Sequence, residues 1–315
     1  MKILWITLAV LAAFIFLILL ISYICFYMAF YVPRKKNKSE EEYPIPPGEI
    51  YEPFRETFMG WMKELKELPH EEVSIKSFDG LTLRAKYYEY APGAPIELMF
   101  HGYRGEARRD LCGGVQRCFA LKRSALIVDQ RACGNSEGNV ITFGIKEHRD
   151  CLDWVNFMLA HFGPDVRIIL TGISMGAATV LMASGKELPP NVIGVLADCG
   201  YTSPKEIIKK VIRQIHLPAN FLYPFVKLGA KPFGHFDLEE LSALEEVTKC
   251  NLPVIFFHGE SDDFVPCEMS RKNYEACSST KRIFTVPGAG HGLSYPVSAE
   301  AYLKELEEFF GPLFQ

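Results

Sequence analysis

The pattern of hydrophobic positions divides the chain into one long apolar run, a polar connection and a region of short alternating elements. Residues 3–32 contain no Lys, Arg, Asp, Glu or His, a run of thirty residues. A transmembrane helix needs only roughly 17 to 25. The rival interpretation, a secretory signal peptide, has an apolar region of about 7 to 15 residues and a small-residue cleavage site, and no clean site follows here. We therefore expect residues 1–33 to form an uncleaved, single-pass membrane anchor.

The residues that follow the apolar run mark the membrane boundary. Tyr23, Tyr27 and Tyr31 match an interfacial aromatic belt, and the basic patch at residues 34–38 comes next. Because only Lys2 and the amino terminus lie on the other side, the positive-inside rule favours a cytoplasmic location for the rest of the chain. Residues 34–48 change from basic to acidic and contain prolines, which predicts a linker before a folded domain at residues 49–315.

After the linker, the apolar positions switch between a helical period and short continuous runs. Residues 54–68 have the spacing of an amphipathic helix, which we expect to pack on the domain; a helix on the membrane surface is the alternative. Residues 73–76 and 81–85 alternate as in an antiparallel hairpin at a sheet edge. Buried strands are predicted at residues 96–100, 125–129, 166–170, 192–197, 253–257 and 282–286, with helices between most of them. This order predicts an α/β fold with a doubly wound, mostly parallel sheet.

One connection is too long for a single crossover helix. About 50 residues separate Asp198 from the strand at residue 253. Ser203, Pro204 and Glu206 form a helix-capping box, and two apolar segments follow it. Such segments also pack on a core, but the length of the insertion predicts a small helical cap at about residues 201–247, above the end of the sheet.

Composition and charge exclude several classes of function. The chain has 315 residues and a formal net charge of −4, so we expect no nucleic acid partner. Its nine cysteines include no C-x-x-C pair, which argues against a disulfide framework and a zinc site and favours reduced thiols in a cytosolic domain. The sequence has no motif for a nucleotide or a metal, so we expect no cofactor and no metal.

The candidate chemistry begins at Gly172-Ile173-Ser174-Met175-Gly176, a G-x-S-x-G pattern between a predicted strand and a predicted helix. In that context the serine occupies a sharp turn that projects its hydroxyl above the sheet, and glycines fit where the backbone is crowded. The following helix also directs its positive end at the site. Ser174 is therefore a candidate nucleophile.

A serine hydroxyl needs a histidine to accept its proton and a carboxylate to orient that histidine. His291 is the best-placed histidine, because it lies in a glycine-rich loop between the last strand and the last helix. For the acid we choose Asp262, in the loop after the strand at residues 253–257. Asp263 is the immediate alternative, since spacing does not separate neighbours on a loop. Asp198 is a further alternative, which would otherwise hold the cap hinge through Tyr201 and Ser203.

Two backbone N–H groups are expected to form an oxyanion hole, which stabilises the charge of a tetrahedral intermediate. One belongs to Met175, directly after the candidate nucleophile, and the other to Tyr103, in the loop after the strand at residues 96–100. His101 and His258 each precede a glycine at a strand end, and we interpret both as residues that hold loops.

The motifs together resemble the α/β hydrolase superfamily, specifically the bacterial branch of serine-aminopeptidase-like (S33-type) and dienelactone-hydrolase-like proteins with a short cap. The resemblance covers about residues 70–312 and rests on residues 101–103, 129–138, 172–176, 198–201, 258–266 and 288–291. It implies the α/β hydrolase fold, with Ser174, Asp262 and His291 as the triad. It also implies that Asp129 and Arg131 have a structural role, and Cys133 departs from the histidine or bulky residue often found at its position.

The expected function is that of a membrane-anchored serine hydrolase acting on a carboxylic ester or related acyl bond. An aminopeptidase-like enzyme and a thioesterase or lipid acyl hydrolase remain alternatives, and so does a non-catalytic ligand-binding protein on the same fold. The anchor and the apolar cap suggest a small-molecule acyl substrate that is amphiphilic and reaches the site from the membrane.

Overall fold

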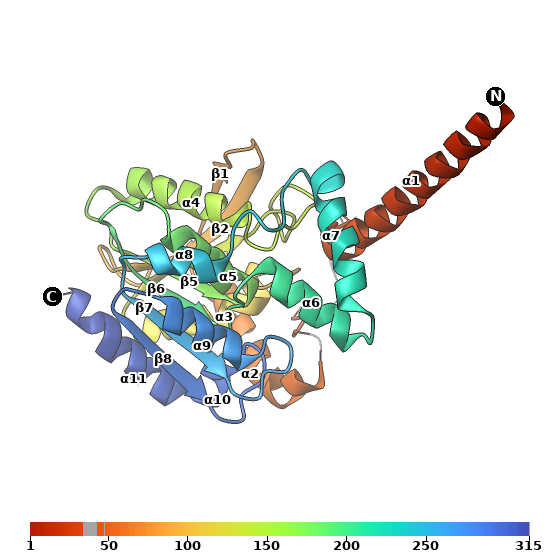
Figure 1. The fold of residues 1–315 in the computed structure, drawn as a ribbon. Coiled ribbons are helices and arrows are strands. Elements are labelled where there is room, and N and C mark those ends of the chain that lie inside the picture. The colour runs from red at the N-terminus through yellow and green to blue at the C-terminus, as the bar shows by residue number, and fades with distance from the viewer. Residues whose placement is uncertain (34–42, 47, 315) are drawn as a thin grey trace.

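The computed structural model describes residues 1–33, 43–46 and 48–314. Figure 1 shows a twisted sheet with helices on both faces and one long helix, α1 (Lys2–Ala29), that projects away from the body of the molecule. Most of the expected linker at residues 34–48 lies outside the described residues.

The centre of the molecule is an eight-stranded sheet in the order β1-β2-β4-β3-β5-β6-β7-β8. Antiparallel pairing joins the first three strands in this order, β1 (Glu71–Lys76), β2 (Thr82–Tyr88) and β4 (Ser124–Asp129). Parallel pairing joins β4 to the remaining strands: β3 (Ile96–Phe100), β5 (Ile168–Ile173), β6 (Val192–Asp198), β7 (Val254–Gly259) and β8 (Lys281–Val286). The predicted doubly wound, mostly parallel sheet is confirmed, with the hairpin at its edge.

One strand extends further than the sequence pattern predicts. β5 begins at Ile168 rather than at Val166, because the Val166 amide donates to the Gly163 carbonyl in a turn. At its other end β5 continues to Ile173, which pairs with Asp198 of β6. The strand therefore ends one residue before Ser174, so that the serine follows the sheet edge without an intervening loop.

Helices cover both faces of the sheet. One face carries the 3-10 segment η1 (Glu49–Phe54), α2 (Arg55–Glu67), α3 (Ala107–Ala120), α10 (Ser294–Val297), α11 (Ala299–Phe310) and the terminal turn η3 (Gly311–Phe314). The other carries α4 (Glu147–Phe162), α5 (Met175–Ser184), α8 (Ala243–Glu246), η2 (Val247–Lys249) and α9 (Cys267–Ala276). Alternate side chains of each central strand serve the two faces, which explains why the strands are apolar throughout.

The helix predicted near residues 54–68 packs on the domain. α2 buries Phe58, Met62 and Leu65 in one apolar cluster with α3. Its apolar face is therefore not available to a membrane, and the alternative of a surface-bound helix is wrong.

Two further helices, α6 (Pro204–Gln214) and α7 (Ala219–Gly234), follow β6 within the expected cap segment. Ser203 caps α6 by accepting a hydrogen bond from the Glu206 amide at 3.2 Å, as the capping box predicts. α7 crosses α1 where that helix enters the body of the molecule (Figure 1).

α1 is long and apolar enough to cross a membrane, with a mean hydropathy of 3.0 over its most apolar window. Most of its side chains are exposed, whereas Phe26 and Phe30 at its end are buried in the core of the domain. Tyr31 pairs with Val140 as an isolated β-bridge. The end of the apolar run is thus part of the domain rather than a free connection.

Candidate functional site

Ser174 lies at the junction of β5 and α5, in a backbone conformation that few residues adopt. Its φ is +56° and its ψ is −116°, a strained turn of the kind that needs support from its surroundings. A Cβ atom at Gly172 would collide with the Gly176 carbonyl, and one at Gly176 would collide with the Phe100 carbonyl of β3. Both glycines are therefore required for α5 to approach the sheet at this sharp angle.

The structure brings Ser174, His291 and Asp262 into one hydrogen-bonded chain. The Ser174 Oγ lies 2.9 Å from Nε2 of His291, and His291 Nδ1 lies 2.7 Å from Oδ2 of Asp262. Because the Asp262 carboxylate accepts a hydrogen bond from the Nδ1–H group, Nε2 carries no proton and its lone pair faces the serine hydroxyl. All three side chains come from loops at the carboxyl ends of β5, β7 and β8, where parallel strands end at the same edge.

The Asp262 carboxylate is held by more than His291. Its Oδ1 accepts hydrogen bonds from the backbone amides of Phe264 at 3.0 Å and Val265 at 2.8 Å. Its Oδ2 lies 3.2 Å from His258 Nε2. Burial alone would raise the pKa of Asp262, but hydrogen bonds from His258 and His291 lower it to about 2. The carboxylate therefore stays ionised at neutral pH and can orient and stabilise a histidinium.

The two alternative acids occupy other positions. Asp263 is exposed, and its backbone carbonyl accepts hydrogen bonds from Lys210 and Gln214 of α6. Asp198 is buried and accepts hydrogen bonds from Ser294 at 3.1 Å and Tyr302 at 3.0 Å. Asp198 therefore ties β6 to α10 and α11, and the expectation that it holds the cap hinge through Tyr201 and Ser203 is wrong.

The loop that carries Tyr103 lies close to Ser174, and Met175 follows the serine directly in the sequence. A Cβ atom built on Gly102 would be 3.8 Å from Ser174 Oγ, which places the loop of Tyr103 next to the hydroxyl. Within the described part of the chain, neither the Tyr103 amide nor the Met175 amide has a protein acceptor. His101 holds this loop, because its Nε2 accepts the Gln130 amide at 3.1 Å while its Nδ1 donates to the Gly102 carbonyl at 2.8 Å.

The same loop is bonded to the end of α1. The Tyr103 hydroxyl donates to the Ala29 carbonyl at 2.7 Å. The Arg104 guanidinium donates to the carbonyls of Met28 at 2.9 Å and Tyr31 at 3.0 Å. These contacts join residues more than seventy positions apart in the sequence, and local patterns give no signal for them.

Three residues make contacts near the site that the sequence did not predict. The Tyr51 hydroxyl, from η1, donates to the His291 carbonyl at 3.0 Å and so supports the histidine loop. The Phe264 ring packs edge-on against the His291 ring, with the centroids 5.1 Å apart. Cys199 is buried beside the histidine and the acid. Of the three, only Phe264 could have been connected with the site from the sequence, because it directly follows the candidate acids Asp262 and Asp263.

One group of side chains could in principle hold a metal ion. Ligand atoms of Cys199, Asp262 and His291 lie within 4.8 Å of one another. Burial and the charge of Asp198 raise the pKa of the Cys199 thiol well above its usual range, so that it stays protonated and is a poor ligand. Two of the three groups also bond to each other, which favours proton transfer over metal binding.

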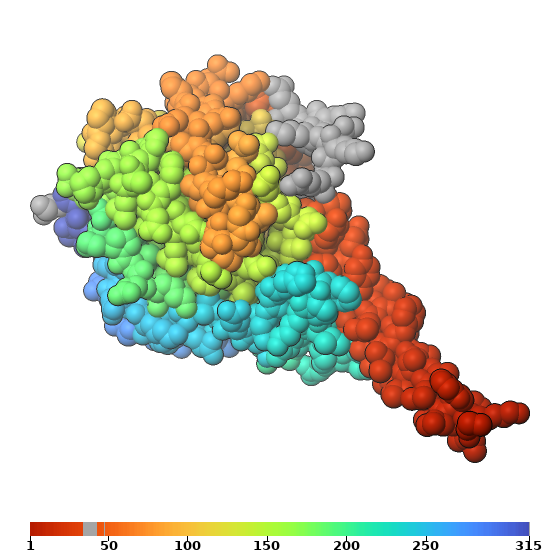
Figure 2. Space-filling model, turned by 90° about the horizontal axis from the view of Figure 1, so that it is seen from above, coloured from red at the N-terminus to blue at the C-terminus, as the bar shows by residue number. Residues whose placement is uncertain are grey.

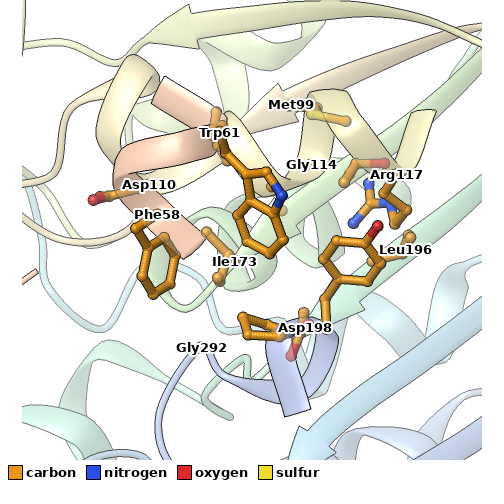
Figure 3. A pocket seen from close by; sticks show the side chains of 16 residues that line it. Phe58, Trp61, Met99, Asp110, Gly114, Arg117, Ile173, Leu196, Asp198 and Gly292 are labelled. Carbon is orange, nitrogen blue, oxygen red and sulfur yellow. The ribbon is translucent and has the colours of Figure 1, made fainter. Parts of the chain in front are cut away.

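A small hollow lies between α2, α3 and α10, behind the sharp turn from β5 into α5 at Ser174, which we call the elbow (Figure 3). Trp61 and Phe58 line it from α2, and Ile173 and Asp198 line it from the sheet. Its volume of about 50 Å³ is far below the roughly 300 Å³ of a small ligand pocket, and its lining includes none of Ser174, Asp262 and His291. The hollow does reach the neighbours of the serine and the histidine, Ile173 and Gly292.

Comparisons with known proteins give distant relatives. No family model matches the sequence. The chain is 28% identical to the uncharacterised protein YqkD of Bacillus subtilis over 187 residues, which make up 59% of this chain and 61% of that protein. It is 29% identical to the uncharacterised membrane protein YNL320W of Saccharomyces cerevisiae over 174 residues, 53% of this chain and 54% of that protein.

Solved structures give a broader match. The esterase Pf2001 of Pyrococcus furiosus superimposes with a TM-score of 0.63 and 22% sequence identity, over 79% of this chain and 94% of the esterase. At this level of identity the likeness shows a common fold.

Proposed function

Because the chain has the α/β hydrolase fold, as its motifs led us to expect, we propose that it is a membrane-anchored serine hydrolase that cleaves a carboxylic ester or a related acyl bond. The observation that carries this proposal is the hydrogen-bonded chain from Ser174 through His291 to Asp262 at the elbow. The fold alone hosts many functions, whereas this geometry supplies a nucleophile, a base and an orienting acid.

In the proposed reaction, Ser174 Oγ attacks the acyl carbon as His291 Nε2 takes the hydroxyl proton. The amides of Met175 and Tyr103 stabilise the oxyanion, and the loss of one such donor typically slows a hydrolase by about 10²–10³. His291 then returns the proton to the leaving alcohol, which leaves an acyl-enzyme on Ser174. Water, deprotonated by the same histidine, releases the acid and restores the serine.

We further propose that α1 anchors the enzyme in a membrane with the hydrolase domain in the cytoplasm. The length and hydropathy of α1 support membrane association, and a yeast relative bears the name of a membrane protein. The basic residues at positions 34–38 support the orientation through the positive-inside rule. An amphiphilic acyl compound would reach the serine from such a surface.

A panel of acyl esters, thioesters and aminoacyl amides, each in a series of acyl chain lengths, tests the reaction class with the full chain in lipid nanodiscs. We expect ester turnover to exceed amide turnover and to be absent in a Ser174→Ala variant. Faster amide turnover would replace the esterase proposal with a peptidase. No turnover of any compound by a folded protein would favour a ligand-binding role.

A further inference from the structure

α7 exposes a row of apolar side chains at helical spacing. Phe221, Pro224 and Leu228 follow one another at intervals of three and four residues, so these three side chains share one face of the helix, and Leu217 lies just before the helix. Phe221 is 65% exposed, Leu217 46% and Leu228 41%. The opposite face of α7, with Tyr223, Val226 and Ala230, is buried. We call the exposed row the α7 stripe.

α7 packs, through residues beside the stripe, on the segment of α1 that meets the body of the molecule. The ring of Phe233, on α7, lies 5.1 Å from that of Tyr23 and 5.8 Å from that of Phe26. Gly229 lets the two backbones approach, because a Cβ atom there would collide with the Ser22 carbonyl. Figure 2 shows the α7 region on the surface beside the C-terminal end of α1, in agreement with Figure 1.

The length of α1 sets the depth at which α7 lies. α1 has 28 residues and is therefore about 42 Å long, whereas the hydrocarbon core of a bilayer is about 30 Å thick and takes up about 20 residues. With Lys2 at one boundary, residues 22–29 fall at the level of the lipid headgroups on the other side. Ser22, Tyr23 and Phe26 are the residues of this segment that contact the C-terminal half of α7, so this half of α7 lies at the same level.

We propose that the α7 stripe is a membrane-binding surface, which inserts its apolar side chains among the headgroups of the bilayer that α1 crosses. The occupant is lipid because α7 packs on a helix that is long enough to span a bilayer and whose own apolar side chains are exposed, and because aromatic and aliphatic side chains on a helix face are typical of interfacial helices. The inference rests on the proposed membrane association of α1. It places the cap, whose α6 bonds to the loop of Asp262, directly on the membrane surface.

The test is a depth measurement on the full chain in phosphatidylcholine and phosphatidylglycerol vesicles. Three variants, Phe221→Cys, Phe16→Cys and Lys122→Cys, receive an environment-sensitive nitrobenzoxadiazole label, and wild type treated alike gives the background of the native thiols. All three positions are exposed, so substitution removes no core packing. Phe16 lies in the middle of α1, and Lys122 lies at the amino-terminal edge of the strands, away from α7.

We expect headgroup nitroxide lipids to quench the label at position 221 at least twofold, acyl-chain nitroxides to quench position 16, and neither to quench position 122. If position 16 is quenched and position 221 behaves like position 122, the stripe faces water or protein and the inference is wrong, while the anchor stands. If position 16 is not quenched, membrane association by α1 and the inference both fail. Hydrolase activity is not read in this experiment, so either result leaves the proposed chemistry to its own test.

Discussion

At the residue scale, the choice between two neighbouring carboxylates decides how the site is assembled. Asp262 points inward to two histidines and two backbone amides, whereas Asp263 is exposed and contributes its carbonyl to the contact with α6. Sequence spacing does not separate these neighbours, because the direction of a side chain on a loop depends on backbone angles that only the folded loop sets. The hydrogen bonds around Asp262 therefore carry information that the motif lacks.

Substitution of each acid by its amide tests this difference. We expect Asp262→Asn to lower kcat by about 10⁴, because an amide does not hold His291 in the productive tautomer. The matched Asp263→Asn variant should stay within about twofold of wild type, since its side chain is exposed. Ester turnover under saturating substrate measures both. Equal losses in the two variants would contradict the assignment of the acid.

Acid stability gives a second test of Asp262. Its pKa is about 2 in the folded chain and about 3.9 in an unfolded one, so the folded state favours the ionised form. The resulting stabilisation, about 2 kcal/mol, is present above pH 4 and is lost as the pH falls toward 2. In unfolding measurements in micelles, Asp262→Asn should flatten the loss of stability between pH 4 and pH 2. An unchanged slope would show that other groups control it.

At the element scale, the elbow depends on how closely α5 approaches β3. Gly176 has no space for a side chain, because the Phe100 carbonyl occupies the position of its Cβ atom. Gly60, a half-buried residue of α2, has no neighbour within 4 Å of that position. The two glycines therefore provide a matched pair in which the same substitution should have opposite effects.

We expect Gly176→Ala to lower the free energy of unfolding by about 3 kcal/mol through overpacking. Gly60→Ala should raise it by roughly 0.5–1 kcal/mol, because alanine loses less backbone entropy in a helix. Thermal unfolding midpoints in micelles measure both changes. A Gly176→Ala protein as stable as wild type would show that the elbow is looser than the structure indicates.

The sheet and the order of its elements could be predicted from the sequence because strands buried on both faces are continuous apolar runs. The three candidate residues Ser174, Asp262 and His291 could be assigned to loops for the same reason, since those loops follow the apolar runs. The extension of β5 to Ile173 and the roles of Tyr51 and Asp198 could not, because each depends on contacts between distant segments. The spacing of apolar residues within one segment does not predict contacts between distant segments.

At the scale of the whole molecule, the end of α1 is part of the hydrophobic core of the domain. Its end contributes Phe30, which is fully buried and packs edge-on against Phe143 and Phe236 at centroid distances of 5.7 and 5.1 Å. Phe143 in turn contacts Tyr103 of the candidate oxyanion loop, at 4.9 Å. The end of α1 and the candidate site therefore share one packed cluster.

Removal of the Phe30 ring should destabilise the folded domain. Phe30→Ala leaves a cavity and should lower the free energy of unfolding by about 3–5 kcal/mol, or the unfolding midpoint by roughly 6–10 °C. Phe16→Ala, on the exposed part of the same helix, should stay within about 0.5 kcal/mol of wild type. Comparable midpoints for the two variants would show that the end of α1 is not part of the core.

The central claim, that Ser174 is the nucleophile of this membrane-associated hydrolase, is tested most directly by reaction with a fluorophosphonate probe. The full chain is labelled in nanodiscs, digested and mapped by mass spectrometry, beside a Ser174→Ala variant. We expect one phosphonylated serine, Ser174, and no labelling of the variant. Labelling that persists after Ser174→Ala, or an absence of labelling in folded wild type, would contradict it.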